Sequence, residues 1–176
     1  IVLEKGGTVL WEVRRVPFDA ETFARLPPSH WTLLVQDVDK HVPEVASLLE
    51  AFRFLPDWRL DDIMISYAVD QGSVGPHVDE YDVFLIQVSG RRRWRIHTRP
   101  VADQEYIPGL DIRILPDFQT EQEWILGPSD LLYLPPGVAH WGSAEGHDCI
   151  TCSVGFRAPT LQEMAAAWCE ARIQPH

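Results

Sequence analysis

Short runs of β-branched and aromatic residues, separated by Gly and Pro, are the feature that most limits how this chain can fold. Such runs are typical of strands, and many short strands with frequent turn signals indicate a β-sandwich or a barrel. The expected strands cover residues 8–18, 31–38, 58–69, 83–88, 91–96, 118–126, 130–134 and 149–156. A tight turn at Ser89-Gly90 is expected to join two of them, 83–88 and 91–96, as a hairpin.

Three helices are expected to flank these strands. Asp19 stands before residues 20–25 as an N-cap, and Pro43 opens a second helix that runs to about residue 52. Residues 160–173 carry the clearest helical pattern, with Thr160 at the N-cap and Glu163 completing a capping box. No repeat or interdomain linker interrupts the 176 residues, which are enough for one domain with a substantial core. We therefore predict a mainly β fold, a double-stranded β-helix of the jelly-roll or cupin kind, with flanking helices.

Charge and cysteine content limit the partners and the compartment. A net charge of −11 argues against nucleic acid, because phosphate binding depends on Lys and Arg, but it suits a basic protein partner. The sequence has no apolar run of membrane-spanning length and no signal peptide. Three cysteines cannot all pair with one another, which indicates a reducing, cytoplasmic setting. Cys149 and Cys152 lie three apart on an expected strand and face opposite sides, so we expect buried free thiols.

A histidine and a carboxylate stand just before the expected strand 83–88. His77 and Asp79 are two residues apart, and such residues point to the same face of a strand. His140, after a Pro-Pro-Gly turn, is the best candidate for a third ligand. Two histidines and one carboxylate with open positions are the ligand set of non-haem Fe(II) oxygenases. We predict that these three residues bind a metal and form the catalytic centre, although His and Asp also serve as caps and surface residues.

Longer segments around these residues are similar to a known family. The chain resembles the JmjC-type ribosomal oxygenases, and most closely the bacterial branch that hydroxylates an arginine of ribosomal protein uL16. The matching segments are residues 52–59, 61–67, 75–87, 90–94, 132–140 and 153–159. The resemblance therefore covers most of the chain, and it implies a JmjC-type β-helix.

The same resemblance implies cofactors, partners and domain organisation. It implies Fe(II), and 2-oxoglutarate and O2 as cosubstrates, with uL16 as the basic protein substrate. The charge and the lack of a long apolar run are the grounds for expecting no direct nucleic-acid or membrane partner. Residues 1–159 would form the catalytic domain, with part of the family's N-terminal region missing before Ile1. Residues 160–176 would begin a C-terminal helical region through which the full-length protein forms a homodimer.

A site for the distal carboxylate of 2-oxoglutarate is expected among three consecutive arginines. Strand alternation puts Arg91 and Arg93 on one face and Arg92 on the other. The resemblance favours Arg92 as the anchor, the alternative being that all three line a solvated edge. Hydroxyl donors could come from Ser66, Thr151 or Ser153, among which parity does not choose. Ser66 and Ser153 are the predicted cosubstrate contacts.

A basic substrate requires carboxylates and an aromatic wall near the metal. Glu80, Tyr81 and Asp82 follow the ligand pair, and Asp70 lies on the preceding turn. We predict that this cluster contacts the substrate, while an ordinary polar rim remains an equal alternative for each member.

Two other functions remain open from the sequence. One is a metal cupin that acts on a small molecule without 2-oxoglutarate. The other is a non-catalytic jelly roll that binds a basic peptide. Loss of 2-oxoglutarate binding in Arg92→Ala argues against the first, and metal in the purified protein argues against the second.

Overall fold

The structure is a computed structural model that describes residues 1–5, 10–100, 105–157 and 159–173. Its strands are β1 (Val2–Lys5), β2 (Leu10–Val13), β3 (Trp31–Val35), β4 (Leu60–Ala68), β5 (His77–Val78), β6 (Val83–Pro100), β7 (Gln122–Leu126), β8 (Leu131–Leu134) and β9 (Val138–Phe156). Its α-helices are α1 (Ala20–Ala24), α2 (Pro43–Ala46) and α3 (Leu161–Ile173), and three 3-10 helices cover Val38–Lys40, Ser47–Phe52 and Asp57–Arg59. The prediction of a mainly β chain with flanking helices is confirmed.

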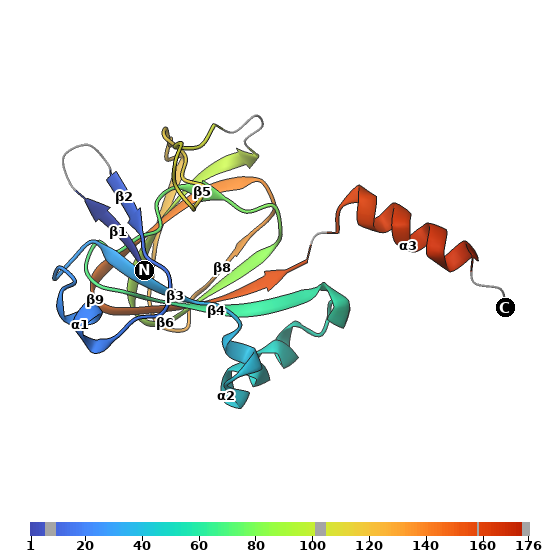
Figure 1. Cartoon of the computed structure of the whole chain (residues 1–176), viewed down its shortest axis with the longest axis horizontal. Helices are drawn as coiled ribbons and strands as arrows, with labels where there is room; N and C mark the ends of the chain where they lie inside the picture. The colour runs from blue at the N-terminus through green and yellow to red at the C-terminus, as the bar shows by residue number, and fades with distance from the viewer. Residues whose placement is uncertain (6–9, 101–104, 158, 174–176) are drawn as a thin grey trace.

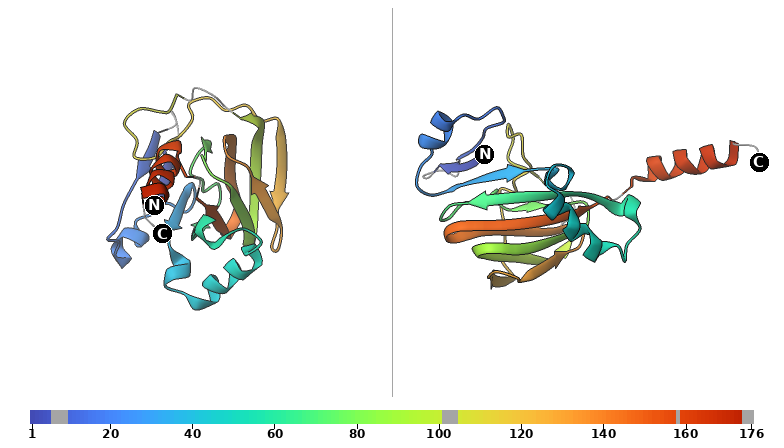
Figure 2. Two further views of the ribbon diagram at one scale, coloured as in Figure 1. Left: turned by 90° about the vertical axis from the view of Figure 1, so that its right-hand side faces the viewer. Right: turned by 90° about the horizontal axis from the view of Figure 1, so that it is seen from below.

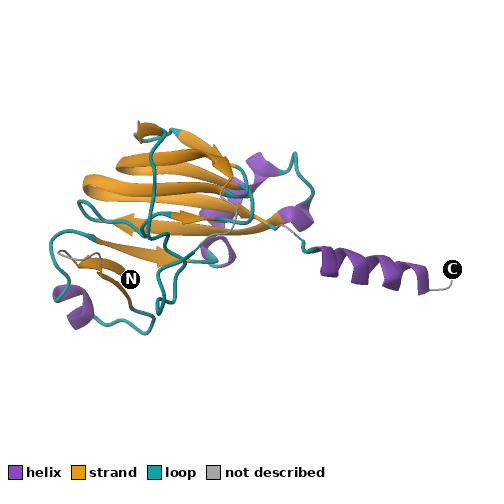
Figure 3. Ribbon diagram, turned by 90° about the horizontal axis from the view of Figure 1, so that it is seen from above, coloured by secondary structure: helices purple, strands orange, loops and turns teal. Residues whose placement is uncertain are grey.

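The strands form one antiparallel sheet that curls on itself (Figure 1). Its order is β2-β1-β3-β4-β9-β6-β7, with β5 paired to β9 and β8 paired to β6. The two long strands β6 and β9 lie side by side over most of their length. Figure 2 shows α2 and the 3-10 turns after it at one end of the body, and Figure 3 shows α3 projecting away from it. The sheet thus places β4, β5, β6 and β9 around one interior.

The expected hairpin at Ser89-Gly90 is wrong, because β6 continues straight through it. Gly90 has a φ of +64°, and the register against β9 shifts on both sides of Ser89. The register shifts beside Ser89 are a β-bulge, and β6 does not reverse its direction there. A Cβ on Gly90 would lie 2.9 Å from the carbonyl oxygen of Asp148 and 2.9 Å from Cα of Cys149. Glycine is required here because β9 pairs with both halves of β6 and passes close to the bulge.

Other element boundaries also differ from the expectation. Strand β9 begins at Val138, eleven residues before the expected start at Cys149. The expected first strand is shorter, Leu10–Val13, and pairs with the unexpected β1; Thr8 lies outside the described residues. The helix from Pro43 changes to 3-10 geometry at Ser47. The side chain of Asp19 accepts a hydrogen bond from Thr22 N, which confirms that cap.

The core has two main parts, one on the inner face of the curled sheet and one on its outer face. One comprises Val83, Leu85, Trp94, Ile96, Leu134 and Val138. The other comprises Phe52, Ile63, Cys152, Val154 and Phe156, covered by the helical segment after α2. Cys149 and Cys152 are both buried free thiols, as expected. Within the described residues, no helix is long and apolar enough to cross a membrane.

Candidate active site

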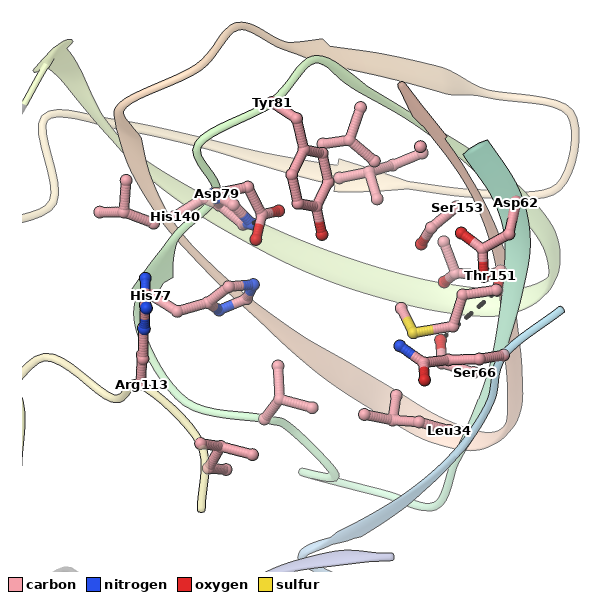
Figure 4. Close-up of a pocket in the computed structure, with 18 of the residues that line it drawn as sticks. Leu34, Asp62, Ser66, His77, Asp79, Tyr81, Arg113, His140, Thr151 and Ser153 are labelled. Carbon is pink, nitrogen blue, oxygen red and sulfur yellow. Dashed lines mark hydrogen bonds and ion pairs between the residues drawn. The ribbon is translucent and has the colours of Figure 1, made fainter. Parts of the chain in front are cut away.

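Two short strand segments bring the predicted metal ligands together. β5 pairs with the start of β9 so that His77 and His140 are register partners. Their ring centroids are 4.2 Å apart, and Oδ2 of Asp79 lies 3.6 Å from Nε2 of His140. One ligand atom from each of the three residues lies within 4.8 Å of the other two. Figure 4 shows the three side chains converging on one side of a cavity, a geometry that suits a single metal ion.

Both histidines are held in the same way by the backbone. Nδ1 of His77 lies 2.9 Å from the carbonyl oxygen of Gly75, and Nδ1 of His140 lies 3.0 Å from that of Val138. A carbonyl only accepts, so each ring carries its proton on Nδ1 and has its Nε2 lone pair free. Such carbonyl contacts fix the orientation and tautomer of metal-binding histidines. The two rings are therefore prepared to coordinate through Nε2.

Burial sets the protonation of the ligand group. His140 is 2% exposed, and burial, with the nearby His77, lowers its pKa to about 3. Its ring is thus neutral at physiological pH and can donate a lone pair. Burial also raises the pKa of Asp79, while His77 and a hydrogen bond with Tyr81 act in the opposite direction. A cation at this position would restore the charge balance that burial of the carboxylate disturbs.

A cavity of about 450 Å³ extends from the triad into the barrel. Arg92 lies in its wall and is 4% exposed. Among the described residues no carboxylate is within ion-pair distance of Arg92, whereas Arg91 and Arg93 both pair with Glu145 on the outer face. Nε of Arg92 is buried without a hydrogen-bond partner in the part of the chain that the structure describes. Since a buried cation is costly when unpaired, this arrangement is suited to an anionic ligand.

The three candidate hydroxyl residues all line this cavity on the wall opposite the triad (Figure 4). Ser66 is the one that contacts the arginine, with Nη2 of Arg92 3.5 Å from its Oγ. Thr151 instead donates its hydroxyl to Oε1 of Gln87 at 2.9 Å. Ser153 is 8% exposed and borders the cavity nearer to Asp62. Ser66 is therefore the hydroxyl best placed to share an anion with Arg92.

The structure divides the four predicted substrate residues into two pairs. Glu80 and Tyr81 line the cavity, but Asp70 and Asp82 do not. Asp70 accepts a hydrogen bond from Gly146 N and so holds a turn. Asp82 pairs with Arg59 and accepts from the hydroxyl of Tyr133, outside the cavity. The chain turns between Asp79 and β6, which directs Asp82 toward Tyr133 on β8. The role of Asp70 and Asp82 as substrate contacts stays a prediction.

Asp62 is a cavity carboxylate that the sequence reasoning missed. It lies on β4 with Met64 and Ser66 at alternate positions, so all three point inward and line the cavity. A Cβ on Gly155 would lie 3.6 Å from Oδ1 of Asp62 and 3.8 Å from Cε2 of Tyr81. The side chains of Asp62 and Tyr81 therefore both lie next to Gly155. Burial, together with neighbouring aspartates, raises the pKa of Asp62. Strand parity counted back from Ser66 is the signal that could have identified it.

The cavity mouth carries one more charged side chain, Arg113. Its Nη1 lies 3.3 Å from Oε1 of Glu80, and its guanidinium lies 5.8 Å from the ring centroid of Tyr106. Both members of the Arg113–Glu80 pair are largely exposed. An exposed pair of this kind is weak and is readily exchanged for another partner.

Comparison with known proteins places the chain in a family. The sequence profile of the JmjC domain matches residues 47–164. The chain belongs to the JmjC domain family. It is 42% identical over 164 residues to the ribosomal protein uL16 3-hydroxylase of Escherichia coli, a match that covers 93% of this chain and 43% of that protein. It is 43% identical over 155 residues to a probable ribosomal oxygenase of Haemophilus influenzae, which covers 88% of this chain and 38% of that protein.

Solved structures show the same JmjC fold. The X-ray structure of E. coli YcfD superimposes with a TM-score of 0.86 at 40% identity and covers 98% of this chain and 45% of that one. YcfD in complex with cobalt and 2-oxoglutarate superimposes with a TM-score of 0.79 at 39% identity, over 98% of this chain and 43% of that one. The predicted jelly-roll fold of JmjC type is confirmed. This JmjC chain spans less than half the length of these relatives.

Proposed function

We propose that this chain is the catalytic domain of an Fe(II)- and 2-oxoglutarate-dependent oxygenase that hydroxylates an arginine side chain of a uL16-like ribosomal protein. One observation carries the proposal: a buried arginine that has no carboxylate partner among the described residues shares a cavity with a preorganised His-Asp-His triad. The relatives support it, since one is named a uL16 3-hydroxylase and YcfD has been crystallised with cobalt and 2-oxoglutarate.

The cavity residues fit both ligands of such an enzyme. His77, Asp79 and His140 offer two neutral imidazoles and one carboxylate to Fe(II), which leaves coordination positions open. The 2-oxo acid end of 2-oxoglutarate suits a position beside the metal, and Arg92 with Ser66 suits the distal carboxylate. Arginine binds carboxylates with two parallel hydrogen bonds. A cupin that does not use 2-oxoglutarate would leave Arg92 buried and unpaired, which disfavours that alternative.

When bound, iron and 2-oxoglutarate supply the oxidation of an unactivated C–H bond with O2. The chain contributes binding, orientation and the exclusion of water. The carbonyls of Gly75 and Val138 hold the two imidazoles in the coordinating tautomer. Arg92 fixes the far end of the cosubstrate and thereby orients its metal-binding end. The apolar cavity residues Val78, Val83 and Leu85 keep bulk water from the reacting groups.

The cavity wall between β4 and Tyr81 suits an arginine side chain. Asp62 provides a carboxylate for the guanidinium, and the ring of Tyr81 provides a face for it to stack on. Glu80 at the mouth adds a second carboxylate once it separates from Arg113. The net charge of −11 favours approach of a basic ribosomal protein. We therefore assign the substrate contacts to Asp62, Tyr81 and Glu80.

The terminal helix is the second part of the proposal. We assign residues 1–159 to the catalytic domain and the segment from Thr160 onward to a C-terminal helical region used for homodimer formation. α3 carries the expected capping box, since Thr160 Oγ1 accepts from Glu163 N at 3.1 Å and the carboxylate of Glu163 accepts from Thr160 N at 2.8 Å. Leu161, Met164 and Trp168 are exposed on it. Exposed apolar side chains of this size support a role in contacts between proteins.

The deciding experiment is incubation of the purified chain with Fe(II), 2-oxoglutarate and a uL16-derived peptide. The expected result is a peptide that gains the mass of one oxygen atom, located on an arginine by tandem mass spectrometry, with equimolar succinate. A peptide in which the arginine is replaced by lysine serves as the control. Absence of both oxidised peptide and succinate, in protein that binds the metal, would contradict the proposal.

A further inference from the structure

Trp94 lies between the two groups on which the proposed function depends. It follows Arg92 by two residues on β6, and Cζ of Arg92 is 5.7 Å from the centroid of its ring. On the other side, the ring centroids of Trp94 and His140 are 5.9 Å apart. The side chain lines the cavity and is 4% exposed. A single indole ring therefore lies beside both Arg92, the predicted carboxylate anchor, and His140, a predicted metal ligand.

The strand opposite Trp94 is adapted to this ring. Gly142 on β9 is the register partner of Trp94, and a Cβ on Gly142 would lie 2.6 Å from Cζ3 and 2.7 Å from Cη2 of the indole. Non-bonded carbon atoms do not approach this closely. The indole thus packs directly on the backbone of the strand that carries His140, two residues before Gly142. A side chain at position 142 would push the ring away.

Hydrogen bonding within the protein does not explain the tryptophan at position 94. Nε1 of Trp94 is buried and has no hydrogen-bond partner among the described residues. A buried donor without an acceptor destabilises a fold, and phenylalanine would fill a core position without that penalty. What tryptophan adds is reach, since its larger ring extends to Gly142 while remaining beside Arg92 and His140.

We propose that Trp94 is a positioning residue that prepares both the metal site and the 2-oxoglutarate site. The inference rests on the proposed function, because both ligands belong to it. Attraction between the guanidinium and the ring restricts Arg92 to the conformation that meets the distal carboxylate. Packing of the ring beside His140 restricts rotation of the imidazole, and a ligand held in its bound geometry loses less freedom when metal binds.

This role has a signature that a purely structural residue lacks. Loss of Arg92 should weaken the binding of 2-oxoglutarate alone. Loss of a metal ligand should weaken the binding of the metal first. Loss of the indole should weaken the binding of both the metal and 2-oxoglutarate in a protein that remains folded. The relevant readouts are therefore dissociation constants and the melting temperature rather than turnover.

The test uses Co(II) and 2-oxoglutarate with wild type, Trp94→Phe and Gly142→Ala. Calorimetry gives the Kd for Co(II), then the Kd for 2-oxoglutarate on the cobalt-loaded protein, and differential scanning fluorimetry reports the fold. We expect Trp94→Phe to raise both Kd values about tenfold, the scale of losses when residues that orient metal ligands are changed. Gly142→Ala should do the same, because its methyl group displaces the ring.

Trp31→Phe is the matched control. Trp31 is a buried indole outside the cavity lining, and its Nε1 donates to the carbonyl of Pro27 at 2.7 Å. This variant should lower the melting temperature and leave both Kd values unchanged. Unchanged Kd values in folded Trp94→Phe overturn the inference. If Trp94→Phe does not fold, unchanged Kd values in Gly142→Ala overturn it instead. Failure of the wild type to bind either ligand overturns the proposed function itself, so the two failures are distinguishable.

Discussion

His77 and His140 face each other as register partners on β5 and β9, with ring centroids 4.2 Å apart. Each donates Nδ1–H to the carbonyl two residues before it. The shared geometry leaves both Nε2 atoms directed at the same position beside Asp79, which is why one short strand pair is sufficient to build a three-ligand centre.

Removal of the carboxylate should remove the metal. Asp79→Ala is expected to weaken Co(II) binding by at least about 100-fold, because it deletes the only anionic group of the triad. Calorimetry or an equilibrium dialysis series measures this directly. Asp82→Asn is the control, since Asp82 contacts Arg59 and Tyr133 rather than the cavity. Unaltered Co(II) affinity in Asp79→Ala removes this residue from the metal site.

The neighbouring arginines provide a direct test of the cosubstrate site. Arg92→Ala should abolish measurable 2-oxoglutarate binding while Co(II) still binds, because the distal carboxylate loses the guanidinium that lines the cavity wall beside Ser66. Arg91→Ala is the control, because Arg91 lies on the outer face, where it pairs with Glu145. This variant should bind 2-oxoglutarate with unchanged affinity. Retention of 2-oxoglutarate binding by Arg92→Ala would favour a cupin that acts without this cosubstrate.

Asp62 should determine affinity for a cationic substrate. Asp62→Asn is expected to reduce kcat/KM for an arginine peptide by about 10- to 100-fold, the range for loss of a hydrogen bond to a charged group. The Kd for 2-oxoglutarate should not change, since the residue of β4 that contacts Arg92 is Ser66, and Asp62 lies further back along that strand. Asp61→Asn is the control, because Asp61 is exposed and pairs with Arg157. Equal effects of the two variants would show that general surface charge, rather than a guanidinium contact, is responsible.

Two glycines of similar conformation separate backbone strain from close packing. Gly90 and Gly146 both have positive φ, +64° and +80°. Alanine at either position should lower the free energy of unfolding by about 1–2 kcal/mol, because the backbone there is left-handed. At Gly90 the Cβ also meets the backbone of Asp148 and Cys149, which adds about 1–3 kcal/mol, whereas nothing lies within 4 Å at Gly146. Urea unfolding should therefore rank Gly90→Ala as the less stable variant, and the reverse order would contradict the bulge.

Local rules predicted those parts of the site that depend on only a few residues. Strand parity put His77 and Asp79 on one face and separated Arg92 from Arg91 and Arg93, and the structure agrees for both. Capping chemistry predicted the start of α3 at Thr160 and Glu163. The resemblance to the JmjC-type ribosomal oxygenases supplied the choice of Arg92 and the expected ligands, which no spacing could provide.

The sequence by itself therefore determined the mainly β class, the pairing of His77 with Asp79 and the separation of Arg92 from Arg91 and Arg93, because alternation and capping act over a few residues. Tertiary structure alone decided that Ser89-Gly90 is a bulge, since only the passage of β9 along both halves of β6 prevents a reversal. It also brought Asp62 to Tyr81 and excluded Asp70 and Asp82 from the cavity. The physical reason is the same in each case: pairing between distant strands sets which side chains share an interior, and no local pattern encodes that pairing.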